Sequence, residues 1–162
     1  MIAIVAISDN WAIGKNGGLP WPRIKEDMKF FKEFTMGKNL VMGRKTFEKM
    51  PQLKGRKILV ATTKKRLHGK TAYKDESTNT VAVYGYQYLN VWGDDIIICG
   101  GAEIYEGSIP ECDEIYITHV KGSYEADTFF PITQKELDKI YPYRYFITSF
   151  EGGHQVIKYS KK

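Results

Sequence analysis

The 162-residue chain lacks the sequence features of exported and membrane-bound proteins. No apolar run approaches the roughly 20 residues that cross a bilayer, and no Asn-x-Ser/Thr glycosylation acceptor occurs. The apolar residues 1–11 have no basic leader or cleavage site, so they indicate a buried strand rather than a signal peptide. The two cysteines, Cys99 and Cys112, form no CxxC pair and no disulfide framework. We therefore expect a cytoplasmic protein with no membrane partner.

The motifs of several enzyme classes are missing as well. His68, His119 and His154 do not have the spacing of metal ligands, so no metal site is expected. The sequence has no GxSxG, which argues against a serine-hydrolase elbow. It has no GxxxxGK followed by Ser or Thr and no GxGxxG, which argues against a Walker A loop and against the usual dinucleotide fingerprint. No repeat, low-complexity tract or linker interrupts the sequence, so residues 1–162 are expected to form one domain.

Basic residues outnumber acidic residues in the sequence. There are 24 Lys and Arg residues against 19 Asp and Glu residues, for a formal net charge of +5 at pH 7. An anionic partner is expected, either a nucleic acid or a small polyanionic ligand. Nucleic-acid binders gather their positive charge on one helix or stripe, whereas here it is scattered except at 64–66 and 160–162. Charge alone does not decide between the two partners.

Short apolar runs rich in β-branched residues alternate with helix-like patterns along the chain. Such runs are typical of parallel strands that are covered on both faces, and the later alternating segments indicate antiparallel strands at one edge. This order predicts an α/β sheet. We expect buried strands at 2–7, 39–42, 57–62 and 95–99, and helices at 24–36, 44–50 and 102–108. Antiparallel strands are expected at 114–120, 143–150 and 154–160. Within 64–95, we expect a strand at 81–84 and a short helix at 86–92.

Ligands of an open α/β sheet bind beyond the carboxyl ends of its strands. After the first strand, the Gly-rich segment 8–21 carries apolar residues that a plain surface loop does not need. These residues favour a mobile loop that covers a bound ligand and excludes water. After the second, a glycine precedes Arg44, Lys45 and Thr46, an arrangement that suits an anion, although Thr46 is equally suited to cap a helix. After the fourth, adjacent glycines at 100–101 indicate either close backbone approach or helix packing.

Asp27 interrupts the apolar face of the helix expected at 24–36. It projects between Phe30, Phe31 and Phe34. An unpaired buried carboxylate costs several kcal/mol, so this one must be paired, protonated or available for a ligand. It is either a first-turn acid that interacts with the helix dipole, or a carboxylate held in an apolar pocket to bind a cationic or doubly donating heterocycle.

Seven segments occur in an order that resembles dihydrofolate reductase. They are GLPW (18–21), with an acid six residues after the Trp, then FFKEFT, VMGRKTFE, LKGRK, IIICGGAEIYE, IYITHV and ADTFFP. The match is close over residues 2–62 and 96–131. The resemblance implies an α/β fold with a mostly parallel, eight-stranded twisted sheet, flanking helices and an antiparallel C-terminal edge. It also implies reduction of 7,8-dihydrofolate to 5,6,7,8-tetrahydrofolate with NADPH as cofactor.

By this resemblance, Asp27 is the catalytic residue. It binds the ring N–H and the 2-amino group of the pterin and promotes protonation of N5, while hydride goes to C6. Thr118 shares that hydrogen-bond network, and Arg56 holds the glutamate carboxylate. The implied substrate-binding residues are Ile4, Ala6, Asp27, Met28, Phe31, Met50, Leu53, Arg56 and Thr118.

The resemblance also implies a cofactor site. Residues 12–19 match the loop that closes over the nicotinamide, and residues 44–46 with Thr62 match positions that bind the adenosine phosphates. The anionic cofactor and glutamate tail account for the net charge of +5 without a nucleic acid. The implied cofactor-binding residues are Ala6, Ile13, Gly14, Lys15, Asn16, Gly17, Gly18, Leu19, Gly43, Arg44, Lys45, Thr46, Thr62, Lys64, Cys99, Gly100, Gly101, Ala102, Glu103, Ile104 and Tyr105.

Three other functions compete with this one. A reductase for a pyrimidine intermediate of riboflavin synthesis has the same fold, but Asp27 after LPW argues against it. A basic nucleic-acid-binding module would need a continuous basic face, which the dispersed charges do not suggest. An inactive folate or nucleotide binder would not need a catalytic acid, so the presence of Asp27 argues against this function. We expect a monomer that binds a small-molecule substrate and no nucleic acid.

Overall fold

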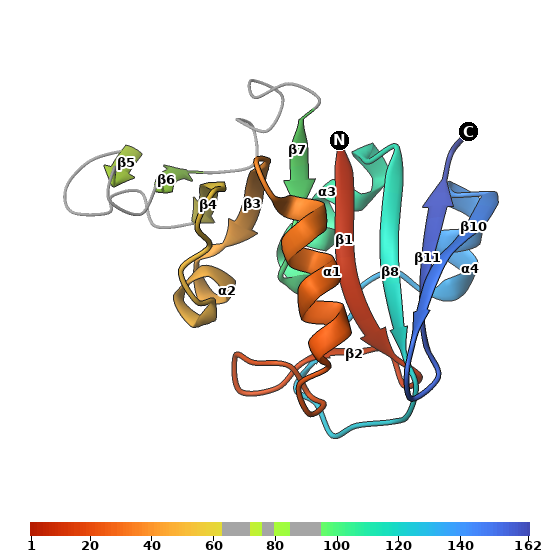
Figure 1. Cartoon of the computed structure of the whole chain (residues 1–162). Helices are drawn as coiled ribbons and strands as arrows, with labels where there is room; N and C mark the ends of the chain where they lie inside the picture. Colours follow the sequence, from red (N-terminus) through yellow and green to blue (C-terminus); the bar gives the residue numbers. More distant parts are fainter. Residues whose placement is uncertain (63–71, 76–79, 85–94) are drawn as a thin grey trace.

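The computed structural model describes residues 1–62, 72–75, 80–84 and 95–162. In that part of the chain, nine strands form one sheet in the order β10-β11-β8-β1-β7-β3-β4-β6-β5 (Figure 1). Strands β2 and β9 form a separate pair. The strands are β1 (Ile2–Ser8), β2 (Ala12–Gly14), β3 (Asn39–Gly43), β4 (Lys57–Thr62), β5 (Ala72–Asp75), β6 (Thr80–Tyr84), β7 (Ile96–Ile98), β8 (Glu114–Val120), β9 (Thr128–Phe129), β10 (Tyr143–Phe150) and β11 (His154–Ser160). The helices are α1 (Lys25–Thr35), α2 (Arg44–Lys49), α3 (Ala102–Ser108), η2 (Ile109–Glu111) and α4 (Gln134–Ile140).

The centre of the sheet is parallel. Strand β1 pairs in parallel with β7 and β8, β3 pairs in parallel with β4 and β7, and β4 pairs in parallel with β6. The carboxyl ends of these strands therefore meet at one edge, where the loops that follow them come together. In this fold class, that edge is where ligands bind.

Both ends of the described sheet are antiparallel. At one end, β11 pairs with β8 and β10 pairs with β11, as the alternating C-terminal segments predicted. At the other end, the short strand β5 pairs antiparallel with β6 and makes a ninth strand where eight were expected. The α/β class, the mostly parallel sheet and the antiparallel C-terminal edge are confirmed.

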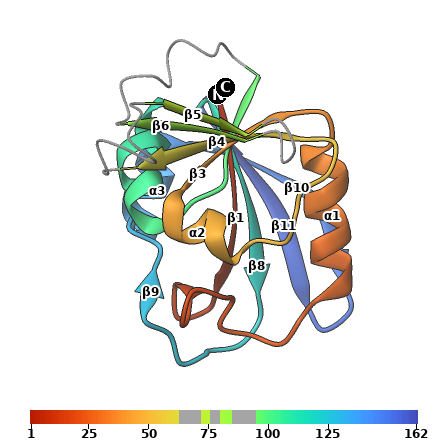
Figure 2. The ribbon, with the colours of Figure 1, turned by 90° about the vertical axis from the view of Figure 1, so that its left-hand side faces the viewer.

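Helices cover the two faces of the sheet (Figure 2). On one face, Phe30, Phe31 and Phe34 of α1 pack against a buried cluster that includes Leu40 and Met42 of β3. On the other face, residues of α3 and α4 belong to a larger buried cluster. With both faces covered, the central strands have no polar side, which explains their continuous apolar sequences.

Five short elements were not predicted, namely β5, which is described above, η2, α4, β2 and β9. Helix α4 begins with a capping box in which Thr133 and Glu136 bond each other's backbone N–H, a signal that was present in the sequence. Strands β2 and β9 pair residues that lie more than a hundred positions apart, as with Ala12 and Phe129, so no local pattern marks them. The predicted strand at 81–84 is β6, and the predicted helix at 86–92 lies outside the described residues.

Candidate active site

A cavity of about 1140 Å³ opens at the carboxyl edge of the sheet. Helix α1 and strand β8 supply one wall, α2 and the start of α3 supply the opposite wall, and the loop around β2 contributes residues between them. It brings together eight of the nine predicted substrate residues, namely Ile4, Ala6, Asp27, Met28, Phe31, Met50, Leu53 and Thr118. It also includes sixteen of the predicted cofactor residues, namely Ala6, Ile13, Gly14, Gly17, Gly18, Leu19, Gly43, Arg44, Lys45, Thr46, Cys99, Gly101, Ala102, Glu103, Ile104 and Tyr105.

Asp27 faces this cavity from the first turn of α1. Its Oδ1 accepts a 2.6 Å hydrogen bond from Oγ1 of Thr118, which is 3% exposed on β8. Burial raises the pKa of Asp27, while the Thr118 hydrogen bond and the nearby His154 partly offset the rise. The site therefore holds a partly desolvated carboxylate whose proton affinity is increased and whose orientation is set by a buried hydroxyl.

The rest of this wall is apolar. Ile4 of β1 is 6% exposed, and Phe31, Met50 and Leu53 pack against the same buried cluster. Met28 remains 36% exposed although it is a large apolar residue. An apolar slot with a single carboxylate suits a flat heterocycle that offers hydrogen-bond donors along one edge.

Arg56 is the one predicted substrate residue that does not line the cavity. It is 6% exposed, its Nε donates to the backbone carbonyl of Lys54 at 3.0 Å, and its Nη1 donates to Oγ1 of Thr35 at 3.3 Å. The guanidinium is thus fastened to the C-terminal turn of α1. Its predicted role in holding a carboxylate stays a prediction.

The glycine pair follows β7, and a hydrogen bond connects it to the end of β3. The carbonyl of Gly100 accepts a 2.8 Å hydrogen bond from the N–H of Gly43, and the Tyr105 hydroxyl donates to the carbonyl of Ile4 at 2.7 Å. Gly100 has a φ of +101°, and a Cβ there would lie 2.8 Å from the Tyr105 ring. Only glycine fits, because both the backbone conformation and the close ring exclude a side chain. The predicted close backbone approach is therefore present, and the Gly100–Gly101 peptide is cis.

The α2 wall carries cations. Nη1 of Arg44 forms a 2.7 Å ion pair with Glu48 one helical turn away, while Lys45 and Lys49 are exposed. Thr46 approaches the glycine pair, since a Cβ on Gly101 would lie 3.2 Å from its Oγ1. The side chain of Thr62 and all of Lys64 lie outside the described part of the chain, so their predicted contacts stay predictions.

The loop after β1 is fastened to the segment before β9. The N–H of Asn16 donates to Oδ2 of Asp127 at 2.7 Å, and the N–H of Asp127 donates to the carbonyl of Gly14 at 3.1 Å. The bond from the Asn16 N–H, with one from the Thr128 hydroxyl, lowers the pKa of Asp127. Lys15 forms a 3.4 Å ion pair with Glu125. Neither Lys15 nor Asn16 lines the cavity.

Sequence reasoning missed several lining residues. Asp127 and Thr128 lie in the quoted segment ADTFFP, and that match was the available signal. Lys49 follows the basic start of α2 by one turn, a spacing that places it on the same side of the helix. The lining residues without a predicted role are Val5, Lys49, Pro51, Ala61, Asp127 and Thr128.

Comparisons with known proteins agree on one family. The family model for dihydrofolate reductase matches residues 1–144. The chain is 37% identical to dihydrofolate reductase type 8 of Escherichia coli over 140 residues, covering 84% of this chain and 83% of that one. It is 40% identical to dihydrofolate reductase of Enterococcus faecium over 131 residues, covering 79% and 75%. A solved dihydrofolate reductase from Enterococcus faecalis in complex with NADP(H) superposes with a TM-score of 0.78 at 28% identity, covering 98% of this chain and 94% of that chain.

Proposed function

The chain belongs to the dihydrofolate reductase family, and on this premise we propose that it reduces 7,8-dihydrofolate to 5,6,7,8-tetrahydrofolate with NADPH. The observation that carries the proposal is the partly buried Asp27, bonded to Thr118 inside the cavity. A one-domain chain, a monomeric state and a cytoplasmic location are parts of the same proposal. Among the described residues, no helix is long and apolar enough to cross a membrane.

Asp27 would bind the pterin and promote its protonation. An ionised carboxylate accepts the ring N–H and the 2-amino group of a pterin side by side, and the Thr118 hydroxyl keeps the carboxylate in the plane of that ring. Because burial raises the pKa of Asp27, the group holds a proton at a higher pH than an exposed aspartate does. A proton delivered to N5, directly or through one water molecule, makes the C6=N5 bond a better hydride acceptor.

The opposite wall would bind the cofactor. When bound, NADPH supplies the hydride that is added to C6. Gly43 and Gly101 line the cavity and would let a pyrophosphate approach the backbone, whereas Gly100 faces the Tyr105 ring and does not line the cavity. Arg44 with Lys45 supplies positive charge. Asp27, Thr118 and the apolar slot hold the acceptor carbon on the other side of the same cavity, so both ligands fit in one space.

The loop around β2 would act as a lid. Ile13 and Leu19 line the cavity, and Leu19 is 48% exposed. Contact with a bound nicotinamide would cover this apolar surface and exclude water from the reacting atoms. The bond that Asp127 donates to Gly14 and the bond that it accepts from Asn16 would favour the closed position.

A kinetic assay tests the proposal. The purified chain should consume NADPH only when dihydrofolate is present, and the product should be tetrahydrofolate. With cofactor deuterated at the transferring position of the nicotinamide, the label should appear at C6 of the product. A substrate panel that includes the pyrimidine intermediate of riboflavin synthesis gives the decisive contrast, because turnover of the pyrimidine without turnover of dihydrofolate refutes the assignment.

A further inference from the structure

Lys49 has a position that the proposed function does not use. It is the last residue of α2, its side chain is exposed, and it lines the cavity. Arg44, the first residue of the same helix, has its charge paired with Glu48 at 2.7 Å. Within the part of the chain that the structure describes, no carboxylate forms an ion pair with Lys49. It therefore brings an unpaired cation to the mouth of the cavity.

The stem of Lys49 also touches the lid. A Cβ on Gly17 would lie 2.9 Å from Cγ of Lys49, 3.0 Å from Cε and 3.3 Å from Cδ. The backbone of the turn, closed by hydrogen bonds between Lys15 and Gly18, thus packs against three methylene groups of the lysine. In Figure 2 this turn lies directly below α2. Lys49 joins the lid to the α2 wall.

Two of the three carboxylates that line the cavity already accept hydrogen bonds within the protein. Asp27 is bonded to Thr118, and Asp127 accepts from Asn16 and Thr128. Glu103 lies on α3 and is exposed. A ligand anion that enters the cavity would therefore find the Lys49 ammonium available. Closing the lid over it would remove water and strengthen the attraction.

We propose that Lys49 couples lid closure to the binding of a ligand anion. Its ammonium binds a phosphate or carboxylate oxygen of the ligand, while its methylene stem supports the 15–18 turn in the closed position. The inference rests on the proposed function for the identity of the two ligands, whose anionic groups are the cofactor phosphates and the glutamate carboxylates. It assigns to Lys49 a positioning role with two separable parts, one electrostatic and one steric.

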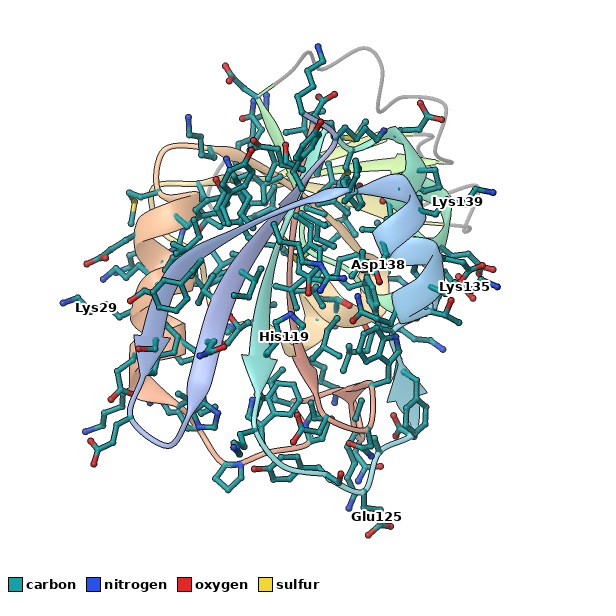
Figure 3. The ribbon with its side chains drawn as sticks, turned by 90° about the vertical axis from the view of Figure 1, so that its right-hand side faces the viewer. Lys29, His119, Glu125, Lys135, Asp138 and Lys139 are labelled. Atoms are coloured by element: carbon teal, nitrogen blue, oxygen red, sulfur yellow. The ribbon has the colours of Figure 1, made fainter. Side chains whose placement is uncertain are left out.

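Two substitutions separate the parts. Lys49→Met keeps an aliphatic stem and loses the charge, and Lys49→Ala loses both. Lys135→Met is the matched control, because Lys135 is an exposed lysine on α4, away from α2 (Figures 1 and 3). Binding of NADPH, of dihydrofolate and of a dihydropterin without the glutamate tail is measured by titration at low and high salt.

The charge is tested by affinity. Lys49→Met should weaken one of the two anionic ligands by about 3- to 10-fold at low salt, and the loss should shrink at high salt, as expected for an exposed charge. A loss for NADPH alone identifies a phosphate, and a loss for dihydrofolate that the tailless dihydropterin does not share identifies a carboxylate. Affinities within twofold of wild type, or an equal loss for the tailless compound, overturn the electrostatic part.

The stem is tested by amide hydrogen exchange of residues 15–18 in the ligated protein. Lys49→Met should keep the wild-type protection factors of these amides. In Lys49→Ala the protection factors should fall about 3- to 10-fold, as expected for the loss of one local packing contact. Equal protection in Lys49→Ala and wild type overturns the steric part. A wild-type protein that binds neither ligand refutes the proposed function instead, so the two failures are distinguishable.

Discussion

The two walls of the cavity hold their charges in opposite ways. On the α1 and β8 side, the Asp27 carboxylate is partly buried and bonded to the hydroxyl of Thr118, a residue that is 3% exposed, and burial raises the pKa of Asp27. On the α2 side, Lys45 and Lys49 are exposed and Arg44 is paired with a neighbouring acid. A desolvated charge interacts strongly and is poorly screened, whereas an exposed charge contributes little and depends on salt. The buried wall is therefore suited to chemistry, and the exposed wall to affinity and cofactor choice.

The largest effect should come from neutralising the buried wall. Asp27→Asn keeps the shape of the side chain but removes the negative charge and the proton route. Hydride transfer at neutral pH should fall by about 10²–10⁴-fold, the range for a positioned acid–base group, and should recover as pH falls and solvent protonates the substrate. Single-turnover rates across pH measure this.

Glu26→Gln is the matched control for that substitution. Glu26 is the other acid in the first turn of α1, and it does not line the cavity. The Glu26→Gln variant should therefore have the turnover of the wild type. If both variants transfer hydride at the wild-type rate at neutral pH, Asp27 is only a first-turn acid and the catalytic assignment is wrong.

A smaller effect is expected from the hydroxyl that orients the acid. Thr118→Val removes the 2.6 Å hydrogen bond to Asp27, and this bond lowers the pKa of Asp27. The apparent pKa in the pH–rate profile should therefore move upward, and kcat/KM should fall about tenfold, typical of a lost bond to a charged group. Thr118→Ser keeps the hydroxyl and should behave as wild type. A Val variant whose profile does not move would show that Thr118 is structural.

The exposed wall should show a modest and selective effect. Arg44→Ala should raise KM for NADPH about 3- to 10-fold and leave KM for NADH nearly unchanged, because a charge-assisted bond to the 2′-phosphate is lost. Glu48→Gln frees Arg44 from its 2.7 Å ion pair and should hold or lower KM for NADPH. Equal losses with both cofactors in Arg44→Ala would mean that the residue supports α2 and does not read the phosphate.

The smallest effect concerns stability. Since burial raises the pKa of Asp27 above its ordinary value of 3.8, the folded state holds the proton more tightly than the unfolded state does. Without ligand, the wild type should lose stability relative to Asp27→Asn as pH rises from 3.8 through the folded pKa, and the difference should then stay constant. At neutral pH the Asn variant should be more stable by about 1 kcal/mol or less. Urea unfolding at several pH values tests this, and a less stable Asn variant at neutral pH contradicts it.

Local patterns in the sequence were enough to predict much of the fold. Strands β4, β8, β10 and β11 begin and end at the predicted residues, and α1 differs from its prediction by one residue at each end. Periodicity places Asp27 on the apolar side of α1 before any partner is known. The glycines at 100–101 likewise follow from the need for close backbone approach at a strand end. Each of these features depends on residues that are close together along the chain.

Contacts between distant segments were decided by the tertiary structure alone. Thr118 lies 91 positions from Asp27, and Asp127 lies 111 positions from Asn16, yet each pair is joined by a hydrogen bond shorter than 3 Å. Nothing in the local sequence of Arg56 shows that its guanidinium is fastened to Thr35 rather than directed into the cavity. Side-chain periodicity follows from backbone geometry within a few residues, whereas these pairings arise only when the sheet closes and brings its strand ends together. The sequence by itself placed the acid on its helix, and only the packing of β8 against α1 decided which hydroxyl orients it.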